Sequence, residues 1–417
     1  MKRLPRGLLA YAAVGLPLAA GALPLYIHVA SVYVESFGAA LAAVGGALLL
    51  TRAADALLDP LIGMAIDRLR RPRTMIVAGV CGMAAGLVLV FHPPAQGTAT
   101  LLWLVLALIP AYLGYSVAAV GHLALGSTFG ATSSERAQVA IWREGFSLLG
   151  VLIAATTPQV LSKDSAAALA DSSLLFAAVA PLAVAALLVM VPNAPNEGTR
   201  APTDILAAWR TFARPPFRGL LTSFAVNGVA NALPSVLVLF FVADVIGAPQ
   251  QSAFFLVAYF AAGAAGLPAW LVLARRRGTQ SAWRTSMLLG AAGFVGAALL
   301  GPGDTWPFLV ICVATGLTLG ADLALPAALL TDGLREKRLD ARVASHFGVW
   351  TFTTKMTVAA AAGLGLPLVG ALGYLPGQTE TAASLQAVYC LVPCGLKLAA
   401  ASVLSLAGHS QTQGALP

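Results

Sequence analysis

The sequence of 417 residues has few charged side chains and few cysteines. Charged residues make up 10% of the chain and hydrophobic residues 59%, whereas soluble domains carry about a quarter charged residues. This deficit excludes a soluble enzyme and a disordered chain. The four cysteines lie within apolar runs, where a thiol behaves as a small buried hydrophobe, so we expect no disulfide framework.

Apolar runs long enough to cross a bilayer, at about 20 residues each, recur along the chain. They predict an all-α membrane protein with twelve transmembrane helices. The expected spans are residues 8–34, 38–66, 73–92, 99–124, 138–160, 172–192, 218–243, 249–273, 281–301, 306–330, 343–371 and 384–407.

Basic residues indicate which loops face the cytoplasm, because Lys and Arg gather on that side of a membrane. If the first residues are cytoplasmic, Lys163 is the only basic residue in the outside loops, and most of the others lie in inside segments. We therefore expect a multi-pass protein of the cell (inner) membrane with both termini in the cytoplasm. The net charge of +8 then reflects topology, and we expect no nucleic-acid partner.

The longest polar stretch divides the chain into two halves. We expect an N-terminal six-helix bundle at 1–192, a cytoplasmic linker at 193–217 with a short amphipathic helix from Thr203 on the inner membrane surface, and a C-terminal six-helix bundle at 218–417. The halves share a Pro-to-Arg spacing, from Pro60 to Arg68 and from Pro268 to Arg276. Two pseudo-symmetric bundles of this kind are typical of transporters.

The second span carries four polar residues within about two helical turns, and each requires an explanation because a charge inside a bilayer is costly. Asp55 and Asp59 lie one turn apart, and Thr51 precedes Asp55 by one turn on the same face. Two neighbouring carboxylates raise one pKa or attract a cation, so we predict a site for H⁺ or Na⁺. The alternative is an ion-pair cluster with Arg52 and Lys355 that only fixes helix packing.

Other polar residues in the predicted spans are candidates for binding a solute. Lys355 is either a counter-ion to the acidic pair, a solute ligand or a lysine that extends to the membrane surface. Arg143 either faces the solute or pairs with Glu144, and His122 either titrates or is a core histidine.

Amide and aromatic side chains complete the candidate set. Asn227 and Asn231 share a helix face ahead of Pro234, which suits either a solute path or hydrogen bonds between helices. Tyr26 and Trp350 either line a cavity or pack in the core. The role of Lys397, in the middle of the last span, is not indicated by its neighbours.

Several motifs resemble those of a known transporter family. Residues 63–71, from Gly63 to Arg71, resemble the loop motif G-x-x-x-D-R-x-G-R of the major facilitator superfamily, with Arg70 in place of the second glycine. Residues 55–60 resemble the D-x-x-x-D-P signature of its melibiose-permease branch, the glycoside–pentoside–hexuronide:cation symporters. Further matches to that branch lie at 322–326, at Asp332, at 350–355 and, more weakly, at 227–234.

The resemblance implies the major facilitator fold and a symporter in which Asp55 and Asp59 bind the coupling cation. It places Thr351 and Lys355 beside that site, and it makes Arg143 the arginine near the sugar. The loop motif implies a role in conformational change for Gly63, Asp67, Arg68 and Arg71, to which we add Arg52. Leu58 stands where sugar-transporting members carry an asparagine that helps to bind Na⁺.

These observations predict a secondary active transporter that couples a small solute, such as a sugar or glycoside, to H⁺ or Na⁺ by alternating access. We expect a monomer in the lipid bilayer, with no cofactor and no metal other than Na⁺ at the acidic pair. Transport or efflux of an amphipathic or lipid-like compound is the alternative. An intramembrane enzyme is disfavoured because its two aspartates would lie on different helices, and a non-transporting receptor would bind a solute without flux.

Overall fold

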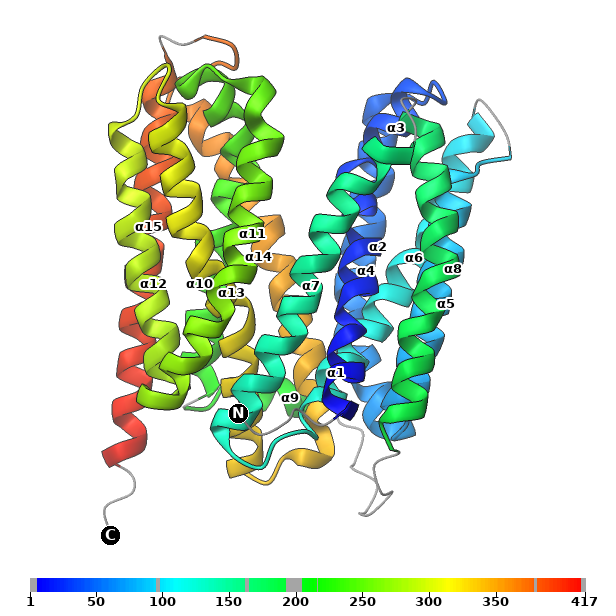
Figure 1. Ribbon diagram of the computed structural model, residues 1–417, viewed down its shortest axis with the longest axis vertical. Helices are drawn as coiled ribbons and strands as arrows, with labels where there is room; N and C mark the ends of the chain where they lie inside the picture. Colours follow the sequence, from blue (N-terminus) through cyan, green and yellow to red (C-terminus); the bar gives the residue numbers. More distant parts are fainter. Residues whose placement is uncertain are drawn as a thin grey trace. The chain divides into compact units, whose positions relative to one another are not determined.

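The computed structural model describes residues 6–94, 98–161, 165–192, 205–215, 217–378 and 381–413, and all regular structure within these ranges is helical. Figure 1 shows the long helices coloured along the chain. The helices of the first half are α1 (Arg6–Ala13), α2 (Gly15–Ile27), α3 (Val29–Glu35), α4 (Leu41–Leu69), α5 (Pro72–Phe91), α6 (Thr98–Gly126), α7 (Ser133–Leu161), α8 (Ser165–Met190) and α9 (Ile205–Phe212). Those that follow are α10 (Phe217–Phe240), η1 (Phe241–Ile246), η2 (Pro249–Gln251), α11 (Ser252–Arg277), α12 (Thr279–Val295), η3 (Gly296–Leu299), α13 (Thr305–Glu336), η4 (Asp340–Arg342), α14 (Val343–Ala371) and α15 (Ala382–Gln413).

Ten segments of the described chain are long and apolar enough to cross a membrane. They cover ten of the twelve predicted spans. The other two predicted spans correspond to α4, which carries Arg52, Asp55 and Asp59 near its middle, and to α12, which has 17 residues. A helix bundle of this kind agrees with the predicted fold class, and the number twelve stays a prediction.

The chain folds as two compact units. The first comprises residues 1–130, 142–205 and 334–352, and the second comprises residues 131–141, 206–333 and 353–417. Helices α7, α13 and α14 each contribute residues to both units. Of the predicted linker 193–217, residues 193–204 and 216 lie outside the described residues, and the predicted short helix is present as α9.

In the first unit, small residues allow α5 and α6 to pack closely. A Cβ atom at Gly86 of α5 would lie 2.3 Å from the backbone nitrogen of Ala111 of α6, and one at Gly114 would lie 2.3 Å from the backbone nitrogen of Met83. Close approach of backbones is typical of helix packing in membranes, where apolar burial does not drive association.

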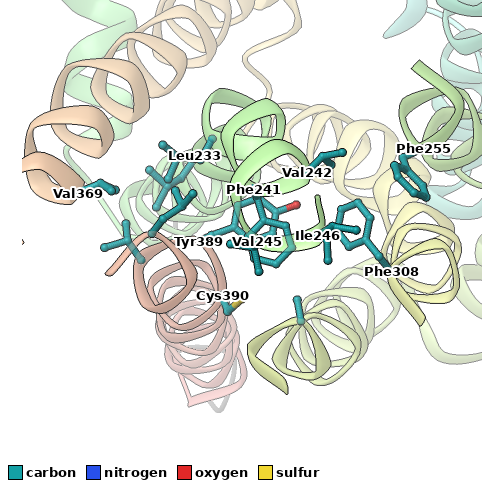
Figure 2. Packing of buried hydrophobic residues seen from close by; sticks show 14 of the residues in the cluster. Leu233, Phe241, Val242, Val245, Ile246, Phe255, Phe308, Val369, Tyr389 and Cys390 are labelled. Carbon is teal, nitrogen blue, oxygen red and sulfur yellow. The ribbon is translucent and has the colours of Figure 1, made fainter. Parts of the chain in front are cut away.

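In the second unit, aromatic and aliphatic side chains from several helices form a buried cluster, seen in Figure 2. Phe241 of η1 stacks on Tyr389 of α15, with ring centroids 4.1 Å apart, and contacts Phe308 of α13 at 5.4 Å. The six-residue π-helix η1 continues α10 and turns Phe241 and Val242 into this cluster. The cluster therefore brings residues of α10, α13 and α15 into one hydrophobic core.

Candidate cation site on helix α4

The two aspartates of the predicted cation site are buried. Asp55 is 5% exposed and Asp59 is 0% exposed, and both project from α4 in the first unit. The serine hydroxyl of Ser116 on α6 donates a hydrogen bond of 2.6 Å to Oδ1 of Asp55. A buried carboxylate with a neutral donor beside it can be stabilised as an anion and still accept a proton.

Arg52 lies on the same helix but is directed at other groups. Its Nε donates to the hydroxyl of Tyr112 at 3.2 Å, and one terminal nitrogen donates to the carbonyls of Leu25 and Tyr26 at 3.3 Å. The guanidinium carbon also lies 4.7 Å from the ring centroid of Tyr26. The side chain of Arg52 is therefore fixed by tyrosines and carbonyls of α2 and α6.

The other predicted members of the site are distributed over both units. The hydroxyl of Thr51 donates back to the carbonyl of Ala47 at 2.7 Å, and that of Thr351 donates to the carbonyl of Phe347 at 3.0 Å. Trp350 is buried in the first unit, whereas Lys355 is half-buried and belongs to the second unit. The position of Lys355 beside the acidic pair stays a prediction.

Helix α14 packs against α4 at Asp59 and Gly63, a contact that sequence reasoning missed. A Cβ atom at Gly348 would lie 2.4 Å from the carbonyl oxygen of Asp59, and one at Gly63 would lie 2.2 Å from the carbonyl oxygen of Ala344. The two glycines, one on each helix, are the signal that could have indicated it. The backbone at Asp59 is thus held by the N-terminal half of α14.

Asp67, predicted to act in conformational change, caps the start of α14. Its carboxylate accepts hydrogen bonds from the backbone N–H groups of Ala344 at 2.9 Å and Ser345 at 2.7 Å, and from the Ser345 hydroxyl. A carboxylate at a helix N-terminus satisfies free N–H groups and interacts favourably with the helix dipole. Burial nevertheless raises the pKa of the Asp67 carboxyl to about 6.

The remaining motif residues end α4. Arg68 and Arg71 are exposed, and Arg70 adopts a left-handed backbone conformation with φ of 53°. This conformation favours glycine, the residue that the resembled motif carries at this position.

The candidate solute residues fall into separate groups. In the first unit, Arg143 is buried and pairs with Glu144 at 2.6 Å, His122 binds the carbonyl of Tyr11 at 2.8 Å, and Tyr26 is 43% exposed. In the second unit, Asn227 and Asn231 contact Lys397 and Asp322, respectively. Arg143 and His122 therefore both have partners close by in the first unit.

A comparison with protein families decides between the classes of function left open by the sequence. The model of the family MFS/sugar transport protein matches residues 8–407. The chain belongs to this family. This MFS protein is a multi-pass membrane transporter and not an enzyme.

Solved structures agree with this assignment at the level of the fold. A bacterial homologue of the iron transporter ferroportin in the outward-facing state has a TM-score of 0.74 and 18% sequence identity, covering 97% of this chain and 98% of its own. The same homologue with soaked iron has a TM-score of 0.73 and 16% identity over 97% and 99%. The E. coli fucose:proton symporter FucP has a TM-score of 0.64 and 17% identity over 95% and 97%. No curated protein matches the sequence.

Proposed function

We propose that this transporter is a cation-coupled symporter in which Asp55 and Asp59 exchange the coupling ion. The observation that carries the proposal is the burial of two carboxylates one turn apart on α4, with Ser116 as a donor to Asp55. Two like charges so close together favour uptake of a proton or a cation, which neutralises part of their repulsion. Binding and release of the ion would then change the stability of the helix contacts around α4.

The proposed coupling ion is H⁺, with Na⁺ as the second candidate. A pair of carboxylates can share a proton without further ligands, whereas a metal cation needs additional oxygen atoms. Leu58, between the two aspartates in sequence, offers no oxygen from its side chain and is 39% exposed. The site is proposed to need no cofactor.

The proposed solute is a sugar or glycoside, in keeping with the family description and with the fucose:proton symport named for FucP. The residues that we propose to contribute to its binding are Lys355, Arg143, Thr351, Trp350, Tyr26, His122, Asn227 and Asn231. We propose a monomer in the inner membrane with cytoplasmic termini.

An amphipathic solute is the second candidate. Tyr26 is 43% exposed and pairs with the ring of Tyr112, with centroids 6.4 Å apart. An exposed aromatic surface of this kind favours a solute that has an apolar part.

The experiment begins with a thermal-shift screen of purified protein against sugars, organic acids and lysophospholipids, each with Na⁺ or Li⁺ and at two pH values. The solute that stabilises the protein is then used in uptake assays with proteoliposomes. We expect an inward pH gradient to drive accumulation and a Na⁺ gradient alone to drive none. Accumulation that follows the Na⁺ gradient and ignores pH would overturn proton coupling, and inverted vesicles would establish the direction of flux.

A further inference from the structure

Lys397 is a buried cation in the middle of α15. It is 8% exposed, and its Nζ donates to Oδ2 of Asp322 on α13 at 2.7 Å and to Oδ1 of Asn227 on α10 at 3.2 Å. A charge in the apolar interior of a membrane protein is costly, and such residues commonly mark a functional site. The pair lies wholly within the second unit, and it is separate from the aspartates of α4.

The carboxylate of Asp322 accepts four hydrogen bonds. Its Oδ1 accepts from Nε1 of Trp283 at 3.1 Å and from the hydroxyl of Ser286 at 3.2 Å, and its Oδ2 accepts from Asn231 at 3.1 Å in addition to Lys397. These donors hold the carboxylate in place, and Lys397 forms a salt bridge with it.

Lys397 retains one donor that these contacts do not use. An ammonium group has three N–H bonds, and within the described part of the chain two of them are directed at Asp322 and Asn227. Lys397 also lines a cavity of about 70 Å³. The third N–H is therefore available to an acceptor atom of a molecule in that cavity.

The rest of the cavity wall is mainly apolar. The wall includes Cys394 and three aromatic residues, Phe255, Phe308 and Tyr389. Figure 2 shows these three aromatic residues within the buried cluster. The exposed Ser235 also belongs to the wall. The volume of about 70 Å³ is about half of the 150 Å³ that accommodates benzene in an engineered cavity, so it favours a short chain.

We propose that this cavity binds a small neutral molecule with a short apolar chain and a strong hydrogen-bond acceptor, such as the carbonyl group of an amide, which receives the third N–H of Lys397. The lysine and Asp322 have no net charge together, so an anionic or a cationic ligand would bring an uncompensated charge into an apolar wall. The proposal does not depend on cation coupling at Asp55 and Asp59.

The test measures binding on the wild-type chain without transport. Purified protein is treated with methyl methanethiosulfonate, and modification of each cysteine is followed by mass spectrometry, with and without 100 mM butyramide, butyrate or butylammonium. Cys394 lines the cavity, whereas Cys390 is fully buried beside it and Cys81 is exposed on α5, so the last two are internal controls. We expect butyramide to slow modification of Cys394 at least fivefold, to leave Cys81 unchanged, and to act more strongly than either charged compound.

Two variants then test the role of the ion pair. Asp322→Asn leaves a net positive charge, so butyrate should now protect Cys394 at least as well as butyramide does. The double variant Asp322→Asn/Lys397→Met removes the donor without leaving an unpaired charge, and protection by butyramide should be lost. The proposal is overturned if Cys394 of the wild type is as unreactive as Cys390, if butyramide gives no protection, or if protection persists in the double variant. If the variants do not fold, the protection of Cys394 in the wild type by butyramide, compared with butyrate and butylammonium, still tests the proposal.

Discussion

At the scale of single residues, the hydrogen bond from Ser116 to Asp55 can be tested by mutation. Ser116→Ala removes a 2.6 Å donor to the carboxylate that we propose binds the coupling ion. We expect the pH profile of solute uptake to differ from that of the wild type, since a hydrogen bond to a charged group contributes about 1.5 to 3 kcal/mol.

Ser223→Ala is the matched control, because Ser223 is equally buried but donates to the carbonyl of Ala400 in the second unit. Its pH profile should equal that of the wild type. Equal profiles for Ser116→Ala and the wild type would show that Ser116 does not influence the coupling site.

The backbone conformation of Arg70 leads us to a second prediction for a single residue, which concerns thermal stability. Arg70 holds a φ of 53°, which costs an L-residue about 1 to 2 kcal/mol and glycine almost nothing. Arg70→Gly should therefore raise the thermal midpoint of unfolding. Arg71→Gly is the control, because Arg71 has a φ of −127° and glycine there should give no gain. A lower midpoint for Arg70→Gly than for the wild type would contradict this account of the turn.

At the scale of helices, the contact between α4 and α14 depends on glycines. A Cβ atom at Gly63 would lie 2.2 Å, and one at Gly348 2.4 Å, from a backbone oxygen of the other helix. Gly63→Ala and Gly348→Ala should each destabilise the protein by about 1 to 3 kcal/mol or separate the two helices. Thermal unfolding of the purified variants measures the loss of stability relative to the wild type.

The same helices provide controls. A Cβ atom at Gly45 of α4 or at Gly363 of α14 would meet no atom within 4 Å. Gly45→Ala and Gly363→Ala should be neutral or slightly stabilising, because alanine favours a helix by up to about 1 kcal/mol over glycine. Equal losses at all four positions would indicate that glycine is needed for another reason.

Asp67 of α4 caps the start of α14, and its titration makes the stability of the protein depend on pH. The pKa of Asp67 is raised to about 6 from 3.8, so the folded state binds the proton more tightly than the unfolded state. The resulting stabilisation is complete below pH about 4 and is lost as pH rises through about 6, and it amounts to at most about 3 kcal/mol.

Melting curves of the wild type and Asp67→Asn between pH 4.5 and pH 7.5 measure this effect. The wild type should lose stability relative to the variant as pH increases, because asparagine does not titrate. A difference between the two proteins that is the same at every pH would contradict the linkage.

The sequence predicts these helices better than it predicts their contacts. The apolar runs predict nearly every helix. The structure buries Asp55 and Asp59, and their role as a cation site stays a prediction. Arg52 could not be placed from the sequence, because its partner Tyr112 is 60 residues away in sequence. The role of Lys397 was missed for the same reason, since Asp322 lies 75 residues before it and Asn227 lies 170 residues before it.

At the scale of the whole molecule, the polar sites of the two units differ in composition. The first unit holds two neighbouring carboxylates on one helix, whereas the second holds an ion pair whose two charges compensate one another. Repulsion within the first favours uptake of an ion, whereas the second leaves no uncompensated charge to attract one. We therefore propose that ion coupling takes place at the acidic pair on α4.

The most direct measurement of this assignment is accumulation of the selected solute in proteoliposomes under an inward pH gradient, with Asp55→Asn and Asp59→Asn. Asp171→Asn is the control, because Asp171 is an exposed aspartate of α8. We expect each of the first two variants to lose concentrative uptake at least tenfold while still binding the solute in the thermal-shift assay, and the control to transport normally. Full accumulation by both Asp55→Asn and Asp59→Asn would contradict the proposed coupling site.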